Sequence, residues 1–545
     1  MPLFLKIMTV VAIDFGTSNT VISILNPDNN SPETLRFGEI SRIFKGKKPT
    51  GENTEIPVIP TVVFIKEGNQ IILGQQVIAT RLGQAQPDRL FQGFKRDLAA
   101  DFQPPPRFVD GLTYSASTIS ESFLKEICHR LNQGGIKPSK LIFTVPVGAF
   151  ARYLDWFREL GSCLDIAEIN IIDESTAAAL GYAIKKPGSV VLVVDFGGGT
   201  LDLSLIRTNA PQPGNSALQA EVLAKSDAYI GGVDIDTWIV EDYLQRQGLS
   251  RSQIGEIGWQ RLLEIAERLK MRLSRATAAK EAWFDDENFM SYEVELSRDR
   301  FDALLDYHQL LEQLRGAVDE VLAVAQGKGI SKAEIEQVLL VGGSCLIPAV
   351  QTLIVSYFGR SRVKMDKPFE AVAHGALALN DAVIVEDYLR HSYAIRLWDP
   401  HCQTYSYFPL FEKGVKYPCE RLEPLMLQAA IEGQREIRLD IGEVAEISQA
   451  EVMFDESGRM IGGALHKREE YRSLDLDGDR VCVAHLNPPG QLGIDRISVR
   501  FEVNSGRVLL ATVRDLVTGE TLVDNEAIAK LKSVILKKRA RCSHS

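Results

Sequence analysis

Paired cysteines are missing from the sequence. Its seven cysteines are scattered, and no two of them form a Cys-x-x-Cys pair. Such pairs are typical of zinc sites and dithiol redox centres, so both classes are excluded. An odd number of separated thiols instead indicates reduced cysteines in a cytoplasmic protein. The cysteines are Cys128, Cys163, Cys345, Cys402, Cys419, Cys482 and Cys542.

Long apolar runs and an excess of positive charge are also missing. No run approaches the roughly 18 apolar residues of a membrane helix, and the opening Met1-Pro-Leu-Phe-Leu-Lys-Ile lacks a cleavage site. We therefore expect neither export nor a membrane span. Asp plus Glu number 72 against 61 Lys plus Arg, a net charge of −11. Because this field repels phosphate backbones, nucleic acid is not an expected partner.

Two common phosphate-binding motifs are absent as well. Neither Gly-x-x-x-x-Gly-Lys-Ser/Thr nor a strand-linked Gly-x-Gly-x-x-Gly occurs, so those nucleotide-binding folds lose support. The 545 residues are 45% hydrophobic and 24% charged. This composition predicts a folded, water-soluble chain with several domains.

The sequence does contain an internal repeat. The segment beginning Asp14-Phe-Gly-Thr-Ser-Asn-Thr returns as Asp195-Phe-Gly-Gly-Gly-Thr-Leu. In each copy a strand of β-branched residues (10–13 and 190–194) precedes the Asp and a Gly-rich turn, and a second apolar strand follows. Each copy therefore predicts a hairpin, and the pair implies a duplicated domain.

Two such turns facing each other would clamp a polyphosphate, because glycines let backbone N–H groups approach phosphate oxygens. Asp14 and Asp195 would hold a hydrated Mg²⁺ that bridges those oxygens. The alternative is a pair of ordinary hairpins in which Asp and Gly only shape the turns. The expected donors are Gly16, Thr17, Ser18, Gly197, Gly198 and Gly199.

A third glycine turn and a helical stripe suggest a nucleoside site. A buried strand (338–341) runs into Gly342-Gly343-Ser344, on which a ribose or flat ring would lie. Upstream, Glu267, Lys270 and Ser274 share one face of a helix predicted over 259–276. A solvated Glu–Lys pair is the competing interpretation of that stripe.

The pattern of predicted secondary structure changes near residue 387. Before it, strands and helices alternate, which predicts an α/β architecture. After it, short strands (436–441, 497–503 and 508–513) are separated by Gly, Pro and Asn clusters, which predicts an all-β domain. The segment 525–540 reads as a basic helix, for which a solvated end is favoured over partner or membrane binding.

These motifs resemble those of the actin, sugar-kinase and heat-shock chaperone ATPase superfamily, and within it the seventy-kilodalton heat-shock chaperones. Further matching motifs are Phe94-Lys-Arg, Thr144-Val-Pro, Asp173-Glu-Ser-Thr-Ala-Ala-Ala, Ile230-Gly-Gly-Val-Asp and Glu370-Ala-Val-Ala-His-Gly-Ala. The resemblance implies a two-lobed actin-like ATPase domain over 1–385, with duplicated ribonuclease-H-like lobes over about 8–190 and 191–385. A linker (386–398), a β-sandwich peptide-binding domain (399–523) and a short basic helical tail (524–545) follow.

The resemblance also implies site roles. Lys95 and Glu174 position the attacking water, and Thr17, Ser18 and Thr200 contact phosphates. Asp14, Asp195 and Asp202 organise Mg²⁺ and its waters, with K⁺ as a further candidate ion. Asp195 and Thr200 thus join Lys95 and Glu174 in the catalytic set. The implied ATP or ADP site also includes Gly231, Gly232, Glu267, Lys270, Ser274, Gly342, Gly343 and Ser344.

The later part resembles the chaperones' peptide-binding β-sandwich, through Phe411-Glu-Lys-Gly-Val-Lys-Tyr-Pro and Gly433-Gln-Arg-Glu-Ile-Arg-Leu. Leu427, Ile437 and Leu439 are candidate groove residues for an extended apolar peptide, and sandwich core is their alternative role. Unfolded polypeptide is the implied partner, with a J-domain co-chaperone and an exchange factor as further candidates.

The best interpretation is an ATP-dependent chaperone with slow ATP hydrolysis. One alternative is an actin-like filament protein, whose assembly on ATP addition would be revealed by light scattering. The other is a small-molecule kinase, which needs a carboxylate base, and no motif for such a base is evident. After Gly519 only 26 residues remain, so we expect no helical-bundle lid and fast peptide release.

The sequence departs from the family at the adenosine turn, where Leu346 replaces an Arg that stacks on the base. Such a stack contributes about 0.5 to 2 kcal/mol. We predict ATP binding that is retained but weaker than in the family, by up to roughly thirtyfold. Titration calorimetry with Mg²⁺ measures it, and a flat titration at millimolar ATP would contradict the prediction.

Overall fold

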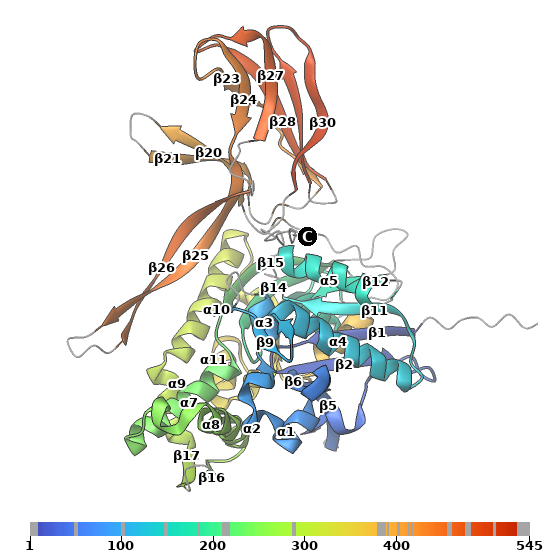
Figure 1. The fold of residues 1–545 in the computed structure, drawn as a ribbon, viewed down its shortest axis with the longest axis vertical. Helices are drawn as coiled ribbons and strands as arrows, with labels where there is room; N and C mark the ends of the chain where they lie inside the picture. The colour runs from blue at the N-terminus through green and yellow to red at the C-terminus, as the bar shows by residue number, and fades with distance from the viewer. Residues whose placement is uncertain are drawn as a thin grey trace, which may run out of the picture. The chain divides into compact units, whose positions relative to one another are not determined.

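The computed structural model describes most of the chain in two compact units (Figure 1). The first unit holds Met1–Ala149 and Tyr153–Val383, and the second holds Phe150–Arg152 and Ile384–Ser545. The described residues are 9–47, 53–99, 104–146, 151–164, 166, 168–182, 186–209, 219–285, 290–378, 389, 392–399, 404–412, 415, 418–454, 460–474, 481–504 and 508–530.

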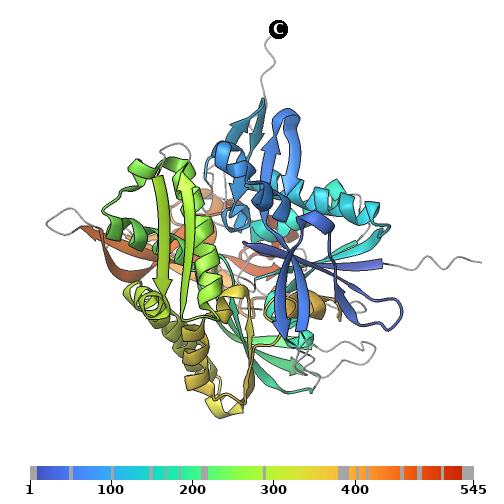
Figure 2. The ribbon, with the colours of Figure 1, turned by 90° about the horizontal axis from the view of Figure 1, so that it is seen from below.

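The first unit contains two sheets with the same arrangement around a central hairpin. The first sheet runs β12-β11-β1-β2-β5-β4, with β3 also on β2, and the second runs β15-β14-β13-β18-β19. In each, the first strand of the repeat pairs antiparallel with the next strand and parallel with a later one. The structure therefore confirms both hairpins of the repeat. Figure 2 shows the two halves of the unit, blue to cyan and green to yellow, on opposite sides.

The strands of the first sheet are β1 (Thr9–Phe15), β2 (Asn19–Leu25), β3 (Pro32–Thr34), β4 (Arg42–Lys47), β5 (Asn53–Pro60), β11 (Pro138–Val145) and β12 (Glu168–Asp173). Those of the second are β13 (Val190–Phe196), β14 (Leu201–Asn209), β15 (Gln219–Ala228), β18 (Ile335–Val341) and β19 (Val363–Lys364). Smaller sheets comprise β6 (Val62–Lys66), β7 (Gln70–Leu73) and β8 (Leu90–Gln92); β9 (Arg107–Val109) and β10 (Leu112–Tyr114); and β16 (Ala278–Asp285) and β17 (Met290–Ser297).

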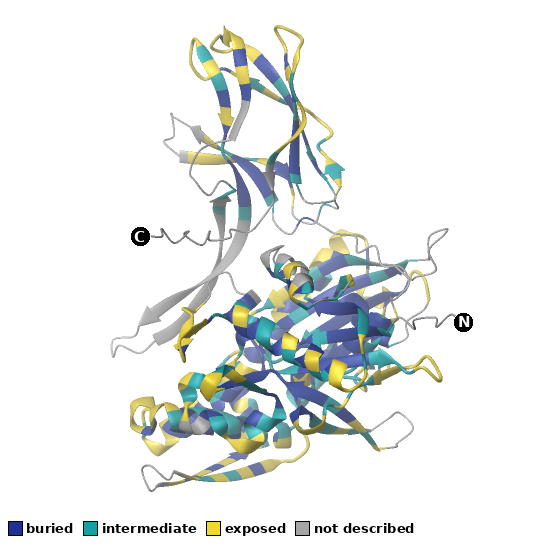
Figure 3. Ribbon diagram, turned by 45° about the vertical axis from the view of Figure 1, so that its right-hand side comes forward, coloured by how far each residue is buried: buried dark blue, intermediate teal, exposed yellow. Residues whose placement is uncertain are grey.

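Helices cover these sheets, and the central strands are buried (Figure 3). The helices of the first half are α1 (Gln75–Thr80), α2 (Leu82–Ala85), α3 (Phe94–Ala99), α4 (Ala116–Gln133), α5 (Ala151–Leu164) and α6 (Glu174–Gly181). Those of the second half are α7 (Gly232–Gln247), α8 (Arg251–Leu273), α9 (Arg298–Tyr307), α10 (Leu310–Gly327), α11 (Pro348–Phe358) and α12 (Ala371–Leu377).

Helices α6 and α12 cross in close contact and join the two halves. Their alanines share one apolar cluster with residues of both sheets, among them Ala12 of β1 and Val193 of β13. Gly375 packs on the backbone of Ala177, and Gly181 packs on that of Ala371, so closely that a Cβ at either glycine would overlap the facing carbonyl. Small residues thus let the two helix backbones approach.

From residue 384 onward, the regular elements that the structure describes are all strands. β20 (Ser392–Asp399), β21 (Thr404–Phe411), β25 (Ile441–Phe454) and β26 (Met460–Ser473) form one sheet. A second contains β22 (Cys419–Glu420), β23 (Leu425–Gln428), β28 (Asp495–Val503), β29 (Val508–Asp515) and β30 (Thr521–Lys530). β24 (Gln434–Leu439) and β27 (Val481–Gly490) make a third.

Three sequence predictions for this unit are wrong. The linker expected over 386–398 is largely strand β20, because Tyr393 and Ile395 are buried in the core. A helix is expected from residue 525, but residues 525–530 belong to strand β30, which pairs with β29 and packs Ile528 on the core. Residues 531–545 lie outside the described residues. Ile437 and Leu439, expected in an open groove, are 5% exposed and belong to that core, against which Leu427 packs.

Replacing Gly375 tests the helix crossing. Gly375→Ala should lower stability by about 1–3 kcal/mol, because the methyl group forces the two backbones apart. Gly316→Ala is the matched control, since nothing lies within 4 Å of a Cβ at this exposed position in α10. It should raise stability by about 0.5–1 kcal/mol. Thermal unfolding followed by circular dichroism measures both, and equal midpoints would contradict the close crossing.

Candidate functional site

The three glycine turns of the first unit line one open cleft. Asp14 and Asp195, at the ends of equivalent strands, line the same cleft, as the duplicated motif predicts. The lining residues are Asp14, Gly16, Thr17, Ser18, Asn19, Val21, Lys95, Glu174, Asp195, Gly197, Gly198, Gly199, Thr200, Gly342, Gly343, Pro368, Phe369 and Val372.

The turn of the second repeat is held in place by its neighbours. The Gly197 carbonyl accepts hydrogen bonds from the Gly232 N–H at 3.1 Å and from the Ser344 hydroxyl at 2.7 Å. A Cβ on Gly198 would collide with Ser18 of the opposite turn, and one on Gly231 would collide with the Gly198 backbone. The two turns therefore meet at van der Waals distance, and Gly231, Gly232 and Ser344 support one of them.

The turn of the first repeat is held by Thr61, which follows β5. The Thr61 N–H donates to the Ser18 carbonyl at 2.9 Å, and its hydroxyl donates to the Gly16 carbonyl at 2.8 Å. Sequence reasoning missed this residue, because nothing in its own motif marks it. Both turns are thus fixed before any ligand arrives.

Four acids lie close together at the turns, namely Asp14, Glu174, Asp195 and Asp202. Burial, and then the charge of Glu174, raise the pKa of Asp14 to about 7, although Thr144 donates a hydrogen bond to it at 2.8 Å. The same two causes raise the pKa of Asp202 to about 7. Burial and the neighbouring acids Glu174, Asp202 and Asp14 also raise the pKa of Asp195. The pKa values rise because the protein compensates the charge of these carboxylates poorly.

Lys95 and Glu174 form a buried pair in the lining of the cleft. Their Nζ and Oε1 atoms are 3.4 Å apart, and the two residues are 8% and 7% exposed. Burial alone would lower the pKa of Lys95, but the nearby acids, Glu174 first, raise it on balance. Glu174 opens helix α6, which Asp173 caps by accepting from the Thr176 N–H at 2.7 Å. The pair is shielded from solvent.

The neighbouring Arg96 has a different environment. Its guanidinium donates to both carboxylate oxygens of Asp234 at 3.1 and 3.2 Å and to the Tyr229 carbonyl at 3.0 Å. Lys95 lines the cleft. Arg96, the next residue of α3, instead connects the first half of the unit to α7 in the second half. Without the family resemblance, Lys95-Arg96 would be interpreted as two charged surface residues.

The cleft fits a hydrated cation better than a directly bound one. Among the described residues, no three or more His, Cys, Asp or Glu side chains are grouped to ligate a metal. Asp14, Asp195 and Asp202 nevertheless lie close enough to raise one another's pKa values or to have them raised by Glu174, and a cation beside them would favour their ionised forms. Mg²⁺ keeps most of its waters in such sites.

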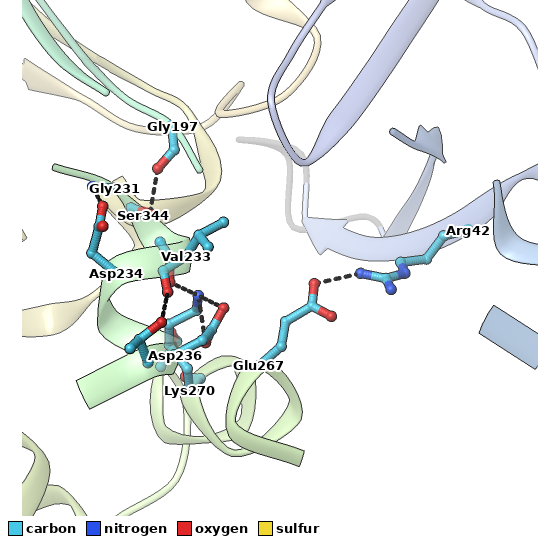
Figure 4. A network of polar contacts seen from close by, with 12 residues as sticks. Arg42, Gly197, Gly231, Val233, Asp234, Asp236, Glu267, Lys270 and Ser344 are labelled. Carbon is cyan, nitrogen blue, oxygen red and sulfur yellow. Dashed lines mark hydrogen bonds and ion pairs between the residues drawn. The ribbon is translucent and has the colours of Figure 1, made fainter. Parts of the chain in front are cut away.

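The helical stripe predicted for a nucleoside is already engaged in protein contacts (Figure 4). Lys270 donates to the Gly232 carbonyl at 2.6 Å and to Asp236 at 2.8 Å. Ser274 donates to the Lys270 carbonyl at 3.2 Å, and Glu267 pairs with Arg42 of β4 at 2.8 Å. None of the three is among the residues that line the cleft. Their contact with a nucleoside stays a prediction.

An apolar wall of the cleft was not foreseen. Phe369 stacks face to face on Phe44 of β4, with ring centroids 4.5 Å apart and planes 5° apart. The wall is completed by Val21, Pro368 and Val372. Asn19 also lines the cleft, and its buried side-chain oxygen has no hydrogen-bond partner.

The chain is similar to known proteins over most of its length. The chain is 26% identical over 532 residues to a protein of Thermotoga petrophila named chaperone protein DnaK, covering 94% of this chain and 79% of that protein. It is 25% identical over 539 residues to the chaperone protein DnaK of Thermosipho melanesiensis, with the same coverage. In the described ranges, no helix combines the length and apolarity of a membrane span. The family model for the Hsp70 protein matches residues 111–397, more than half of the chain. The chain therefore belongs to the Hsp70 family.

Proposed function

We propose that the first unit is a two-lobed, actin-like ATPase and that the second is a β-sandwich that binds extended polypeptide. Together they would act as an ATP-dependent chaperone in the cytoplasm. The observation that carries this proposal is the shared cleft, in which the turns after Asp14 and Asp195 face each other beside the Lys95–Glu174 pair. The relatives named chaperone protein DnaK support the same function.

In this proposal the turn backbones bind the nucleotide phosphates. N–H groups of both turns donate to the phosphate oxygens, and Thr17, Ser18 and Thr200 add hydroxyl donors. Lys95 and Glu174 hold the attacking water in line with the γ-phosphate, because alignment and charge compensation dominate phosphoryl transfer. Asp14, Asp195 and Asp202 would hold Mg²⁺ through its waters, and the ion would neutralise charge on the phosphates. K⁺ is a second candidate ion for the same acids.

The proposed peptide site is on the second unit. The loops after β23 and β27 meet at a bridge between Ala429 and Leu492. On these loops Ile431 is 66% exposed, Leu492 62% and Ile494 48%. Adjacent exposed apolar side chains suit an extended apolar segment. A J-domain co-chaperone and an exchange factor are the proposed regulators.

Lys95→Ala tests the hydrolytic role. Loss of the ammonium should lower ATP turnover by about a hundredfold or more and abolish stimulation by an unfolded peptide. Nucleotide affinity should change much less, because the turns bind the phosphates. Phosphate release and calorimetry, each with and without peptide, measure the two effects.

Lys66→Ala, on the exposed end of β6, is the control and should behave as wild type. Undiminished turnover in Lys95→Ala would contradict the assignment of this residue. Peptide-insensitive turnover in the wild type would favour a binding scaffold over a chaperone.

A further inference from the structure

The aromatic ring of Phe369 lies against the third glycine turn. The Pro368 carbonyl accepts a hydrogen bond from the Gly342 N–H at 2.7 Å, which connects this segment to the turn. A Cβ on Gly343 would lie only 3.2 Å from the Phe369 ring. All four residues line the cleft. The turn on which the sequence predicts a ribose or flat ring is thus bordered by an aromatic side chain of the protein.

The Phe369 ring is held in one orientation by its neighbours. Phe44 of β4 covers one of its faces in the parallel stack described above. Both rings pack against an apolar cluster that includes Val21 and Ala373. Phe369 is nevertheless only partly buried, and it lines the cleft, whereas Phe44 does not. The ring is therefore fixed before a ligand arrives, which lowers the entropy cost of binding.

Phe369 differs in kind from the rest of the cleft lining. Of the described residues that line the cleft, it alone is aromatic. The polar groups expected for a nucleoside include Lys270 and Ser274, which bond within the protein and do not line the cleft. Leu346, at the end of the glycine turn, is apolar and does not line it either. Among these groups, only Phe369 offers the cleft a flat surface.

An aromatic ring at this position matches the chemistry of a nucleobase. A base of any kind can stack on an aromatic side chain, because every base has a π face. The third glycine turn also adjoins the turn of the second repeat, since the Ser344 hydroxyl donates to the Gly197 carbonyl at 2.7 Å. The phosphates and the base of one nucleotide would thus occupy neighbouring parts of one cleft.

We propose that Phe369 is the stacking surface for the purine base of the bound nucleotide, and that Phe44 holds its ring in place. The inference rests on the proposed ATPase function, because it names a residue that binds the nucleotide of that site. The contact contributes affinity and takes no part in hydrolysis. Stacking does not read the hydrogen-bonding groups at the edge of a base, so adenine and guanine nucleotides gain equally from it.

Phe369→Ala removes the ring. The affinity for Mg-ADP should fall about fivefold to a hundredfold, which is the range for loss of one base–aromatic stack. The affinity for Mg-GDP should fall by the same factor. Mg-tripolyphosphate has no base, so its affinity should stay at the wild-type value. Titration calorimetry measures all three affinities.

Phe369→Trp keeps an aromatic ring and reports direct contact. This variant should recover most of the ADP affinity that Phe369→Ala loses. A base stacked on the new indole should quench its fluorescence when ADP or GDP is added, whereas tripolyphosphate should leave it unchanged. The same titration of the wild type, which has five tryptophans, supplies the baseline. A ring that only supports the wall would respond alike to nucleotide and to tripolyphosphate.

Trp283→Ala is the matched control. Trp283 stacks on Tyr292 in the β16–β17 hairpin, with ring centroids 4.8 Å apart and planes 14° apart. Neither ring is among the residues that line the cleft. Loss of this stack should therefore leave the affinities for ADP, GDP and tripolyphosphate unchanged.

The outcomes separate this inference from the proposed function. Unchanged ADP affinity in Phe369→Ala, equal losses for ADP and tripolyphosphate, or unequal losses for ADP and GDP would each overturn the stacking role. If Phe369→Ala fails to fold, the Phe369→Trp titration decides, and an unquenched indole overturns the proposal. A wild-type protein that binds tripolyphosphate but not ADP would overturn it too. One that binds neither would instead overturn the proposed function.

Discussion

The crossing of α6 and α12 fixes the geometry of the first unit. Glycine at each contact lets one helix rest on the backbone of the other, and the alanines around them bind both sheets into one cluster. Glu174 begins α6, and Val372 lies in the first turn of α12, so both helices deliver residues to the cleft. A change in helix separation would therefore move both walls of the site.

Stability and function oppose each other around this cleft. Asp14, Asp195 and Asp202 are partly shielded from solvent and have raised pKa values, and the Tyr153 hydroxyl is buried without a partner. Each arrangement is unfavourable in the protein alone, because charge and unpaired polar groups lose solvation on burial. A bound nucleotide with its cation would lower the electrostatic cost of ionising these acids. The pattern is typical of sites built for charged ligands.

Contacts between the two halves of the first unit come from residues with no distinctive motif. Arg42 pairs with Glu267, Arg96 with Asp234, and Phe44 stacks on Phe369. Each contact joins residues more than a hundred positions apart. Local sequence carries no trace of such pairs, because a partner is defined only once both sheets have folded. The same reason hid Thr61 from sequence analysis.

The sequence by itself determined the repeated hairpins, the acids at their strand ends and the glycine turns, because these depend on local spacing and backbone freedom. It also determined that an α/β part of the chain is followed by an all-β part. Only tertiary structure decided that 525–530 extend a strand, that Ile437 and Leu439 are core, and that Lys270 bonds within its own half. Those outcomes depend on which surface a segment packs against, and the free energy of packing overrides local preference.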